Sequence, residues 1–297
     1  MKVLCTGAAG FIGSHLVDEL IAQGHEVFGI DNLSTGKLEN VNEKCYFEPF
    51  DIKKPLEELP IFDQSFDIIF HLAAKANLQA SIVDPVDSNE ENVRGTLNVL
   101  EYARKTGAVV VFSSSSAVYG ETFYASDERE DTFPMSPYAL QKQIGEQYMK
   151  LYNQIYGLRG VALRYFNVFG PRQPESGSYQ TVMGIFSNQL KAGKPLTIVG
   201  TGEQRRDFVY VKDVAKANVR AGEYALRSKA FDIFNVGSGK NYSVNEIADL
   251  MNPGGKREKL PKRIEPMGTL ADISKAKTLL NWEPKVTLEQ YVSTLQS

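Results

Sequence analysis

Cysteine is scarce in this chain, with only Cys5 and Cys45 among 297 residues, which excludes a disulfide framework. Both lie in apolar, strand-like segments, so we expect buried, reduced thiols. Long apolar runs are also missing, because the longest, such as residues 68–74, fall short of the ~18 residues that a membrane span needs. The glycine-containing start soon meets Asp18 and Glu19, which argues against a secretory leader. We therefore expect a cytoplasmic protein that does not contact membranes.

An excess of one charge is missing as well. The 33 Lys and Arg residues against 36 Asp and Glu give a net charge of −3, which offers no electrostatic attraction for nucleic acid. With 42% hydrophobic and 23% charged residues, the composition is that of a globular protein, large enough for one big domain or two unequal ones. We expect no metal site.

Short β-branched runs alternate with helix-length amphipathic segments through the first half, which is the pattern of βαβ units. Strands are expected at residues 2–6, 26–30, 45–48, 66–71, 109–113 and 160–165. Helices are expected at residues 10–22, 86–104 and 139–156, with apolar side chains at three-to-four spacing. The sequence therefore predicts an α/β fold with a doubly wound parallel sheet of the Rossmann type.

The composition of the sequence changes after Gly170, where a polar loop with proline, glycine and serine begins. The elements beyond this loop are short and mixed. We expect residues 1–170 to form the Rossmann domain, which also receives segments around 205–237. Residues 171–297 are expected to form mainly a smaller, discontinuous α/β cap.

The first expected strand runs directly into Gly7, Gly10 and Gly13, which are spaced for a dinucleotide-binding turn. Glycines here allow a tight turn and a close backbone approach to a pyrophosphate, while the helix N-terminus supplies N–H donors. The second strand ends at Asp31, whose carboxylate can accept the ribose hydroxyls of an adenosine and repels a 2′-phosphate. NAD is therefore favoured over NADP. NADP stays an alternative, because Lys37 could pair with a 2′-phosphate.

Tyr138 and Lys142 stand four residues apart at the start of an expected helix, so their side chains share one face. A nearby ammonium favours the phenolate and makes Tyr138 a candidate general base. Serines 113–116 follow the preceding strand, at the carboxyl edge where open α/β sheets bind ligands. One of these hydroxyls can hydrogen-bond the substrate oxygen, and a plain strand-end turn is the other interpretation of Ser114 and Ser116.

With these residues in place, the sequence resembles the extended short-chain dehydrogenase/reductases, and among them the UDP-glucose 4-epimerase-like nucleotide-sugar enzymes. The resemblance runs from Gly7 to about Trp282. It rests on the ordered motifs TGAAGFIGSHL, DNLSTG, HLAA, NVRGTLNVLEYA, SSSSAVYG, SPYALQK, LRYFNVFGPRQ, GEQRRDFVYVKD, FNVGSG and TLADISKAK.

The resemblance implies NAD as the cofactor and a UDP-sugar as the substrate, which the smaller cap would bind. Tyr138 and Lys142 would be the catalytic pair, and Ser115 the catalytic serine. The cofactor would be lined by Gly7, Gly10, Phe11, Ile12, Gly13, Asp31, Asn32, Asp51, Ile52, Leu72, Ala73, Ala74, Lys75, Asn92, Ser113, Tyr138, Lys142 and Tyr165, with Asp51 and Ile52 at the adenine. The substrate would contact Ser115, Tyr138, Asn167, Thr197, Val199, Arg206 and Glu265.

In this resemblance Asn167 and Arg206 would hold the diphosphate of the substrate. The planar, charged fork of Arg206 suits phosphate oxygens, and a surface salt bridge with a neighbouring aspartate is the alternative. The later family pattern is shortened here, so that either Lys262 or Arg263 would be the second cation.

The residues after Ser115 discriminate between reactions in this family. Dehydratase-like and decarboxylase-like members carry carboxylates just before Val-Tyr-Gly, whereas this chain has Ser116 and Ala117. The resemblance therefore favours NAD-dependent C4 epimerisation of a UDP-hexose, UDP-glucose and UDP-galactose, through a 4-keto sugar whose ring turns before reduction. Dehydration or decarboxylation of a nucleotide sugar and a non-catalytic NAD-binding regulator are the alternatives.

Three further expectations follow from the resemblance. The position three residues before Asp272 is bulky in members restricted to glucose and galactose, and here it is Thr269, which would leave room for the 2-acetamido group of UDP-GlcNAc or UDP-GalNAc. NAD would stay tightly bound, because each cycle regenerates it. A homodimer would form through residues 86–104 and 139–156, and simple covering of the sheet by these helices is the alternative.

Overall fold

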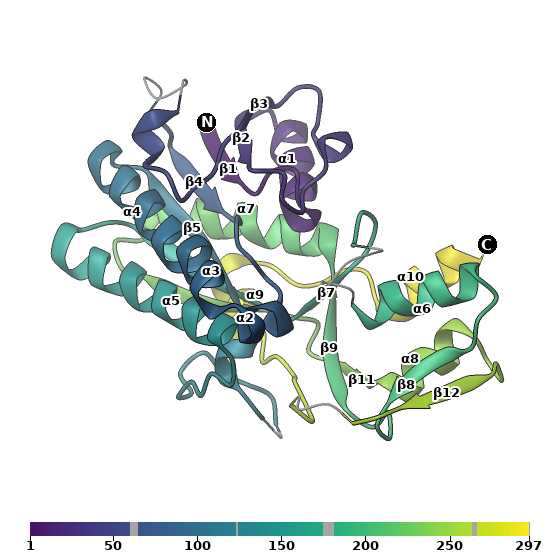
Figure 1. Ribbon diagram of the computed structural model, residues 1–297. Helices are drawn as coiled ribbons and strands as arrows, with labels where there is room; N and C mark the ends of the chain where they lie inside the picture. Colours follow the sequence, from purple (N-terminus) through teal and green to yellow (C-terminus); the bar gives the residue numbers. More distant parts are fainter. Residues whose placement is uncertain (60–64, 123, 175–180, 263–265, 297) are drawn as a thin grey trace.

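A sheet of parallel strands forms the centre of the larger part of the molecule (Figure 1). The computed structural model describes residues 1–59, 65–122, 124–174, 181–262 and 266–296. Seven strands pair in the order β10-β6-β5-β4-β1-β2-β3, and each pair is parallel. They are β1 (Lys2–Thr6), β2 (Glu26–Asp31), β3 (Tyr46–Pro49), β4 (Ile68–His71), β5 (Val109–Ser115), β6 (Gly160–Tyr165) and β10 (Asp232–Val236).

The direction of winding changes between β1 and β4, which are neighbours in the sheet. From β1 the chain proceeds to β2 and β3 on one side, and from β4 to β5 and β6 on the other. The carboxyl ends of β1 and β4 therefore form the topological switch point, where open α/β sheets bind ligands. The predicted doubly wound Rossmann sheet is confirmed, with β10 as a strand that the sequence did not reveal.

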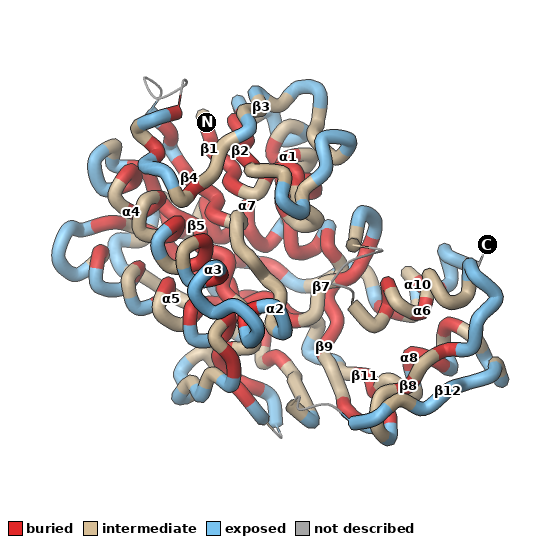
Figure 2. Tube along the Cα trace, in the orientation of Figure 1, coloured by how far each residue is buried: buried red, intermediate tan, exposed pale blue. Residues whose placement is uncertain are grey.

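Helices cover both faces of this sheet. Helices α1 (Phe11–Ala22) and α7 (Val211–Arg227) share one buried apolar cluster with the strands, and α9 (Ser274–Leu280) packs on α7. Helices α4 (Gly95–Thr106) and α5 (Pro137–Tyr156) share the cluster on the opposite face. Figure 2 shows that the buried residues concentrate along the strands between these two helical layers.

Helix α5 carries clear start and stop signals. Its N-cap is Ser136, whose hydroxyl accepts a hydrogen bond from the backbone N–H of Ala139, and Pro137 occupies the first turn, where proline needs no partner for its missing N–H. The helix ends at Gly157, which has a φ of +68°, as a left-handed C-terminal residue requires. The catalytic pair expected from the sequence therefore lies in the first turns of a well-defined helix.

The helix expected over residues 86–104 is interrupted in the structure. It divides into α3 (Pro85–Asn89), a π-helical turn over Glu90–Arg94 and α4, with α2 (Leu78–Val83) preceding them. Single-turn π-helical segments often occur at functional sites, and this one carries Asn92 of the predicted cofactor site. Shorter 3₁₀ turns are η1 (Leu38–Asn40), η2 (Leu56–Glu58) and η4 (Ser116–Tyr119).

A smaller α/β part lies beside the carboxyl edge of the sheet, at the lower right of Figure 1. Its apolar core lies between two short sheets and three helices. One sheet has the order β11-β9-β7 and the other pairs β12 with β8. The elements are β7 (Asn167–Phe169), β8 (Leu196–Val199), β9 (Arg205–Tyr210), β11 (Asn241–Ser243), β12 (Arg257–Leu260), α6 (Val182–Lys191), α8 (Val244–Met251) and α10 (Leu288–Gln296).

The chain passes repeatedly between the two parts. It enters the cap at β7 and returns where β9 runs directly into α7, so that of the segment 205–237, β9 belongs to a cap sheet while α7 and β10 lie in the Rossmann part. It then contributes β11, α8 and β12 to the cap, α9 to the Rossmann part and α10 to the cap. The cap is therefore assembled from separate segments.

Both cysteines are free thiols. Cys5 is buried in β1, whereas Cys45 is only half-buried and precedes β3, which corrects the expectation that both are fully buried in strands. Among the described residues, no helix combines the length and apolarity that crossing a membrane requires. Within the same residues, no cluster of three or more His, Cys, Asp or Glu side chains is placed to hold a metal ion.

Candidate active site

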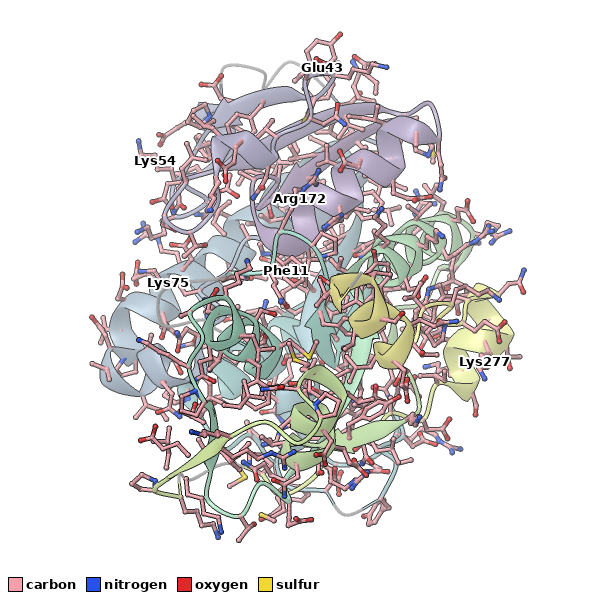
Figure 3. All side chains as sticks on the ribbon, turned by 90° about the vertical axis from the view of Figure 1, so that its right-hand side faces the viewer. Phe11, Glu43, Lys54, Lys75, Arg172 and Lys277 are labelled. Carbon is pink, nitrogen blue, oxygen red and sulfur yellow. The ribbon has the colours of Figure 1, made fainter. Side chains whose placement is uncertain are left out.

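The loop between β1 and α1 is compact because glycines occupy its tightest points. Gly7 has a φ of +74°, and a Cβ added there would lie 2.8 Å from the backbone nitrogen of Ala73. A Cβ on Gly13 would lie 2.0 Å from the carbonyl oxygen of Gly7. Helix α1 begins after Gly10 without a side-chain cap, which leaves its first turn suited to an anion. In Figure 3, which faces the cap, Phe11 lies at the end of α1 nearest the cap.

Asp31 at the end of β2 is held beside this glycine loop. Its Oδ2 accepts a hydrogen bond from the backbone N–H of Ala9 at 3.1 Å, and its Oδ1 accepts one from that of Leu33 at 2.8 Å. Burial raises the pKa of Asp31, and both N–H groups act in the opposite direction. A Cβ on Gly36 would lie 2.8 Å from Oδ2, so the next loop passes close to the carboxylate. This fixed acceptor at the second strand suits a ribose.

The segment after β4, Leu72 to Lys75, is held by Asn92. The Asn92 amide accepts from the Lys75 N–H at 2.8 Å and donates to the Lys75 carbonyl at 3.0 Å. It also donates to the side-chain oxygen of Gln141 at 2.8 Å. Asn92 is buried, so its described contacts position residues 72–75, and its direct contact with a cofactor stays a prediction.

His71 joins the same region and was not among the predicted site residues. Its Nδ1 lies 2.8 Å from the hydroxyl of Thr6, and its Nε2 lies 3.0 Å from the hydroxyl of Thr96. The Thr6 hydroxyl also accepts from the N–H of Ala73 at 3.1 Å. Burial, followed by the nearby charge of Lys142, lowers the pKa of His71 to about 3. The HLAA motif was visible in the sequence, but these partners from distant segments were not.

Asn32 follows β2, and Asp51 and Ile52, the residues expected at the adenine, follow β3. The Asn32 amide donates to Oε1 of Glu91 at 3.2 Å, and the Asp51 carboxylate lies 3.3 Å from Nζ of Lys53. Ile52 is buried in the sheet core, so contact with an adenine would fall to its backbone. Glu91 is buried, and its Oε2 has no hydrogen-bond partner among the described residues. No motif in the sequence pointed to Glu91.

Tyr138 and Lys142 are both buried near the end of β5. Nζ of Lys142 donates to the carbonyl oxygen of Ser113 at 2.7 Å and lies 6.0 Å from the centre of the Tyr138 ring. Burial lowers the pKa of Lys142 to about 7, against the charge of Glu146, which raises it. An ammonium in this place favours the phenolate of Tyr138. The geometry therefore brings the predicted pair together at the sheet edge.

The serines at the end of β5 and the start of η4 have different surroundings. The Ser114 hydroxyl donates to Oε1 of Glu146 at 2.5 Å in the buried layer under α5. The Ser115 hydroxyl accepts from the N–H of Ala117 at 3.2 Å and caps η4. Ser115 is half-buried at the carboxyl edge, while Ser116 is buried. Of these serines, Ser115 therefore keeps the position that a catalytic hydroxyl needs, and its role stays a prediction.

Tyr165, also expected at the cofactor, lies at the end of β6 next to Ser115 of β5. Its hydroxyl donates to Oδ1 of Asn218 on α7 at 2.7 Å. Burial raises the pKa of Tyr165. In the described structure this side chain belongs to the core between the sheet and α7, and its contact with a cofactor stays a prediction.

The cap residues expected at the substrate lie on neighbouring elements. Asn167 of β7 donates its amide to the carbonyl oxygen of Asp207 at 3.1 Å, and Arg206 of β9 donates to that of Arg205 at 2.9 Å. Thr197 of β8 exchanges hydrogen bonds with Gln189 on α6. Val199 ends the same strand and is half-buried.

Thr269 lies beside β9. Its hydroxyl accepts from the N–H of Asp207 at 3.3 Å, and its N–H donates to the carbonyl oxygen of Arg205 at 3.1 Å. The Thr269 side chain is thus turned toward the strand that carries Arg206. Of the two candidate second cations, Lys262 is exposed near Gly200, whereas Arg263 and the predicted contact Glu265 lie outside the described residues.

Two contacts join the cap entrance to α1. The ring Nε2 of His15 lies 2.9 Å from the carbonyl oxygen of Pro171, and Arg172 donates to the carboxylate of Asp18 at 2.8 Å. Figure 3 shows Arg172 over the part of the molecule that contains α1. The segment after β7 is therefore fixed against the helix whose first turn faces the cap.

The arrangement fits NAD. The glycine positions form a cradle that any Cβ at Gly7 or Gly13 would fill, and α1 begins at this cradle. Asp31 presents a carboxylate at the next strand end, and Lys37, the reason to consider a 2′-phosphate, pairs with Glu39 at 3.2 Å. Tyr138 and Lys142 lie at the far end of the same sheet edge, where a nicotinamide ribose would lie.

Comparisons with known proteins identify the family of this chain. Residues 3–237 match the model of the NAD dependent epimerase/dehydratase family. A Methanocaldococcus jannaschii protein, provisionally named UDP-glucose 4-epimerase, is 41% identical over 97% of this chain and 95% of its own length. The solved UDP-glucose 4-epimerase of Thermotoga maritima, with UDP-glucose, is 37% identical with a TM-score of 0.91, over 98% of this chain and 96% of that one.

Two further solved structures are similar to this chain. UDP-N-acetylglucosamine 4-epimerase from Methanobrevibacter ruminantium, in complex with UDP-N-acetylmuramic acid, is 37% identical with a TM-score of 0.88, over 99% and 98% of the two chains. UDP-glucose 4-epimerase from Thermus thermophilus, in complex with NAD, is 36% identical with a TM-score of 0.89, over 98% and 96%. Taken with the glycine cradle and the Tyr138–Lys142 pair, these matches show that the chain belongs to the NAD-dependent epimerase/dehydratase family, as an enzyme of the UDP-sugar 4-epimerase group.

Proposed function

We propose that this enzyme interconverts UDP-glucose and UDP-galactose by oxidation and reduction at C4, through a 4-keto sugar. The observation that carries the proposal is the combination of a buried Lys142 beside Tyr138 with the absence of any carboxylate at positions 116–118, which are Ser, Ala and Val. An elimination or decarboxylation needs an additional acid or base next to the sugar, and this chain offers none there. Of the groups that the protein itself supplies, epimerisation needs only the phenol, the lysine and a hydroxyl, since the hydride would pass to bound NAD and return from it.

Each residue then has a defined task. The Tyr138 phenolate accepts the proton of the sugar O4 and later returns it, while Lys142 keeps that phenolate stable through its charge. The Ser115 hydroxyl donates a hydrogen bond to the same oxygen. When bound, NAD supplies the hydride acceptor for C4. Asn167 and Arg206 hold the diphosphate, which leaves the hexose free to present either face.

The second element of the proposal concerns the hexose at C2. Thr269 is a small side chain turned toward β9 by its contact with the N–H of Asp207, which supports space for a 2-acetamido group beside the sugar. We therefore propose that UDP-GlcNAc and UDP-GalNAc are also interconverted. Thr269→Tyr is expected to abolish turnover of UDP-GalNAc while UDP-galactose is still converted, because a phenol would occupy this space.

The test is proton NMR of the purified protein with NAD and, separately, UDP-galactose and UDP-GalNAc, following the anomeric signals. The gluco epimer is expected from both. Good turnover of UDP-galactose without any turnover of UDP-GalNAc would contradict the role of Thr269. A keto or deoxy product without a C4 epimer would assign a sister reaction instead.

Tyr138→Phe tests the assignment of Tyr138 as the general base. Removal of the general base is expected to lower kcat by about 10²–10⁴-fold, while the NAD released from the purified variant on denaturation equals that released from wild type. Tyr148→Phe, on the same helix and outside the site, is the matched control and keeps full activity. Retained turnover in the Tyr138 variant would refute the assigned base.

Tight binding of NAD is part of the proposal, because the cofactor returns to its starting state in each cycle. Denaturing the purified protein in acid or heat and assaying the supernatant is expected to release close to one NAD per chain. A protein that is purified without NAD and requires it at millimolar concentration would contradict tight binding.

A further inference from the structure

A buried ion pair lies directly behind the serines at the end of β5. Glu146 of α5 and Arg164 of β6 are 4% and 3% exposed. The guanidinium is bidentate, since Nε donates to Oε1 at 2.9 Å and Nη2 donates to Oε2 at 2.7 Å. A buried ion pair of this kind gains little stability over a well-packed apolar pair, because both charges lose their water. We therefore looked to the contacts of the pair for a role other than stability.

The contacts of the pair indicate that role. Ser114 and Arg164 are directly opposite each other on adjacent strands, and the Ser114 hydroxyl donates to Oε1 of Glu146 at 2.5 Å. The next residue on one side is Ser113, whose carbonyl oxygen accepts from Nζ of Lys142 at 2.7 Å. The next residue on the other side is Ser115. Strand end and helix are thus joined by two hydrogen bonds from consecutive residues.

Both bonds meet the same face of α5, because Glu146 follows Lys142 by four residues and Lys142 follows Tyr138 by four. A shift of α5 along the strand would break both bonds at once. These two hydrogen bonds therefore set the distance between the Ser115 hydroxyl and the Tyr138 phenol. Misplacement of a reacting group by about 1 Å can lower the rate on the order of 10²-fold.

The other side of Arg164 reaches the loop that follows Ser115. Its guanidinium carbon lies 4.6 Å from the centre of the Tyr119 ring, and the Tyr119 hydroxyl donates to Oδ1 of Asn235 at 2.8 Å. The Asn235 amide donates to the carbonyl oxygens of Ser126 and Asp272. The pair is thus connected to the segment beyond η4 and to the segment that follows Thr269.

We propose that the Glu146–Arg164 pair is a positioning device that fixes Ser115 at the end of β5 against the helix that carries Tyr138 and Lys142. The pair acts through Ser114 and touches no substrate atom itself. The inference rests on the proposed roles of Ser115, Tyr138 and Lys142, and it names residues that the reaction needs only for the placement of these groups.

Two variants test the device. Ser114→Ala removes the bond between strand and helix and leaves the ion pair in place. The double variant Glu146→Leu/Arg164→Met replaces the pair with apolar side chains, which is expected to preserve folding. Glu101→Gln is the matched control. Like Glu146, Glu101 accepts hydrogen bonds from an arginine, Arg104, and from a hydroxyl, that of Tyr152, but it lies on α4 outside the site.

The measurements are kcat, KM for the UDP-sugar, thermal unfolding, and hydrogen–deuterium exchange of the peptides that cover residues 113–120. Ser114→Ala is expected to lower kcat about tenfold or more with KM within about twofold, and to speed exchange in residues 113–120. The double variant is expected to do the same at a near wild-type melting temperature. Glu101→Gln leaves kcat and this exchange unchanged.

A folded double variant with wild-type kcat would overturn the proposal, as would a Ser114→Ala variant that loses thermal stability but neither kcat nor protection of residues 113–120. If the double variant does not fold, Ser114→Ala alone decides. If the wild-type protein epimerises no UDP-sugar, the proposed function fails, while the exchange measurement, made on the protein without substrate, still supports or overturns the positioning.

Discussion

A histidine with a fixed tautomer connects the ends of the two strands that flank the switch point. The Thr96 hydroxyl donates its hydrogen to the carbonyl oxygen of Asn92 at 2.6 Å, so it accepts from His71, and Nε2 carries the proton. The Thr6 hydroxyl then donates to the bare Nδ1 while it accepts from Ala73. Each donor in this series of hydrogen bonds, from Ala73 through Thr6, His71 and Thr96 to Asn92, therefore has an acceptor. Protonation of His71 would place a second donor against Thr6 and a second cation near Lys142.

The lowered pKa of His71 makes the free energy of unfolding depend on pH. The folded pKa of His71, about 3, lies below the ordinary 6.5, so between these values the unfolded chain binds the proton and the folded chain does not. Stability from the neutral ring is complete above pH 6.5 and is lost as pH falls. Between pH 7.5 and 5 we expect a loss of about 2 kcal/mol from this group.

The measurement is urea unfolding of the wild type and of His71→Gln at both pH values. The variant is expected to be less stable at pH 7.5 but to lose about 2 kcal/mol less on acidification. His25→Gln, which alters a more exposed histidine, is the control and keeps nearly the wild-type dependence. Equal pH dependence in wild type and His71→Gln would contradict the neutral, bridging ring.

At the scale of elements, α5 packs closely on β5 at Gly145. A Cβ on Gly145 would lie 2.4 Å from Cζ of Phe112, whose ring is buried and has little freedom to move. Gly145→Ala gains up to about 1 kcal/mol of helix propensity, but overpacking is expected to cost about 1–3 kcal/mol and to push α5 outward.

We therefore expect Gly145→Ala to lower the free energy of unfolding and, since α5 carries Tyr138 and Lys142, to lower kcat as well. Urea unfolding and turnover of UDP-galactose measure the two effects. Gln147→Ala, an exposed change on the same helix, is the control for a side chain that touches no strand. Wild-type kcat in the Gly145 variant would show that the helix tolerates displacement.

Periodicity and motif spacing predicted most strands, the helices α1 and α5, and the Tyr138–Lys142 pair. They did not predict the break in the helix over 86–104, because the π-helical turn arises from tertiary contacts of Asn92 with residues 75 and 141. The family motif pointed to Ser115, but the sequence did not predict the partner of Ser114, since the alternation of a strand gives opposite faces without saying which one Glu146 covers.

At the scale of the whole molecule, α5 leaves apolar side chains on the surface. Leu140, Leu151 and Ile155 are 47%, 44% and 59% exposed, and Val86 on α3 is 72% exposed. On α4 the large apolar side chains are instead turned to the sheet. The stripe on α5 supports the dimer that the sequence predicts, with α5 as its centre.

We propose that Leu151→Glu/Ile155→Glu converts a dimer into a monomer, because two buried carboxylates on each side of the interface would be unpaired. Sedimentation equilibrium at micromolar concentration measures this, with wild type expected at twice the chain mass of 33.0 kDa. Leu295→Glu on α10, where Leu295 is 50% exposed, is the control and leaves the mass unchanged. A monomeric wild type would sink the proposal.

The direct run of β9 into α7, and the later returns of the chain to the cap, have a consequence for how this enzyme can acquire new substrates. Recombination between relatives exchanges contiguous stretches of gene, yet no contiguous stretch encodes the cap. A transplanted cap would need several matched junctions, one of them at the point where β9 runs directly into α7. Changes of sugar preference are therefore more accessible through single substitutions, at positions such as Thr269 that we propose to line the sugar, than through exchange of modules. Libraries for altering specificity are better built around such positions.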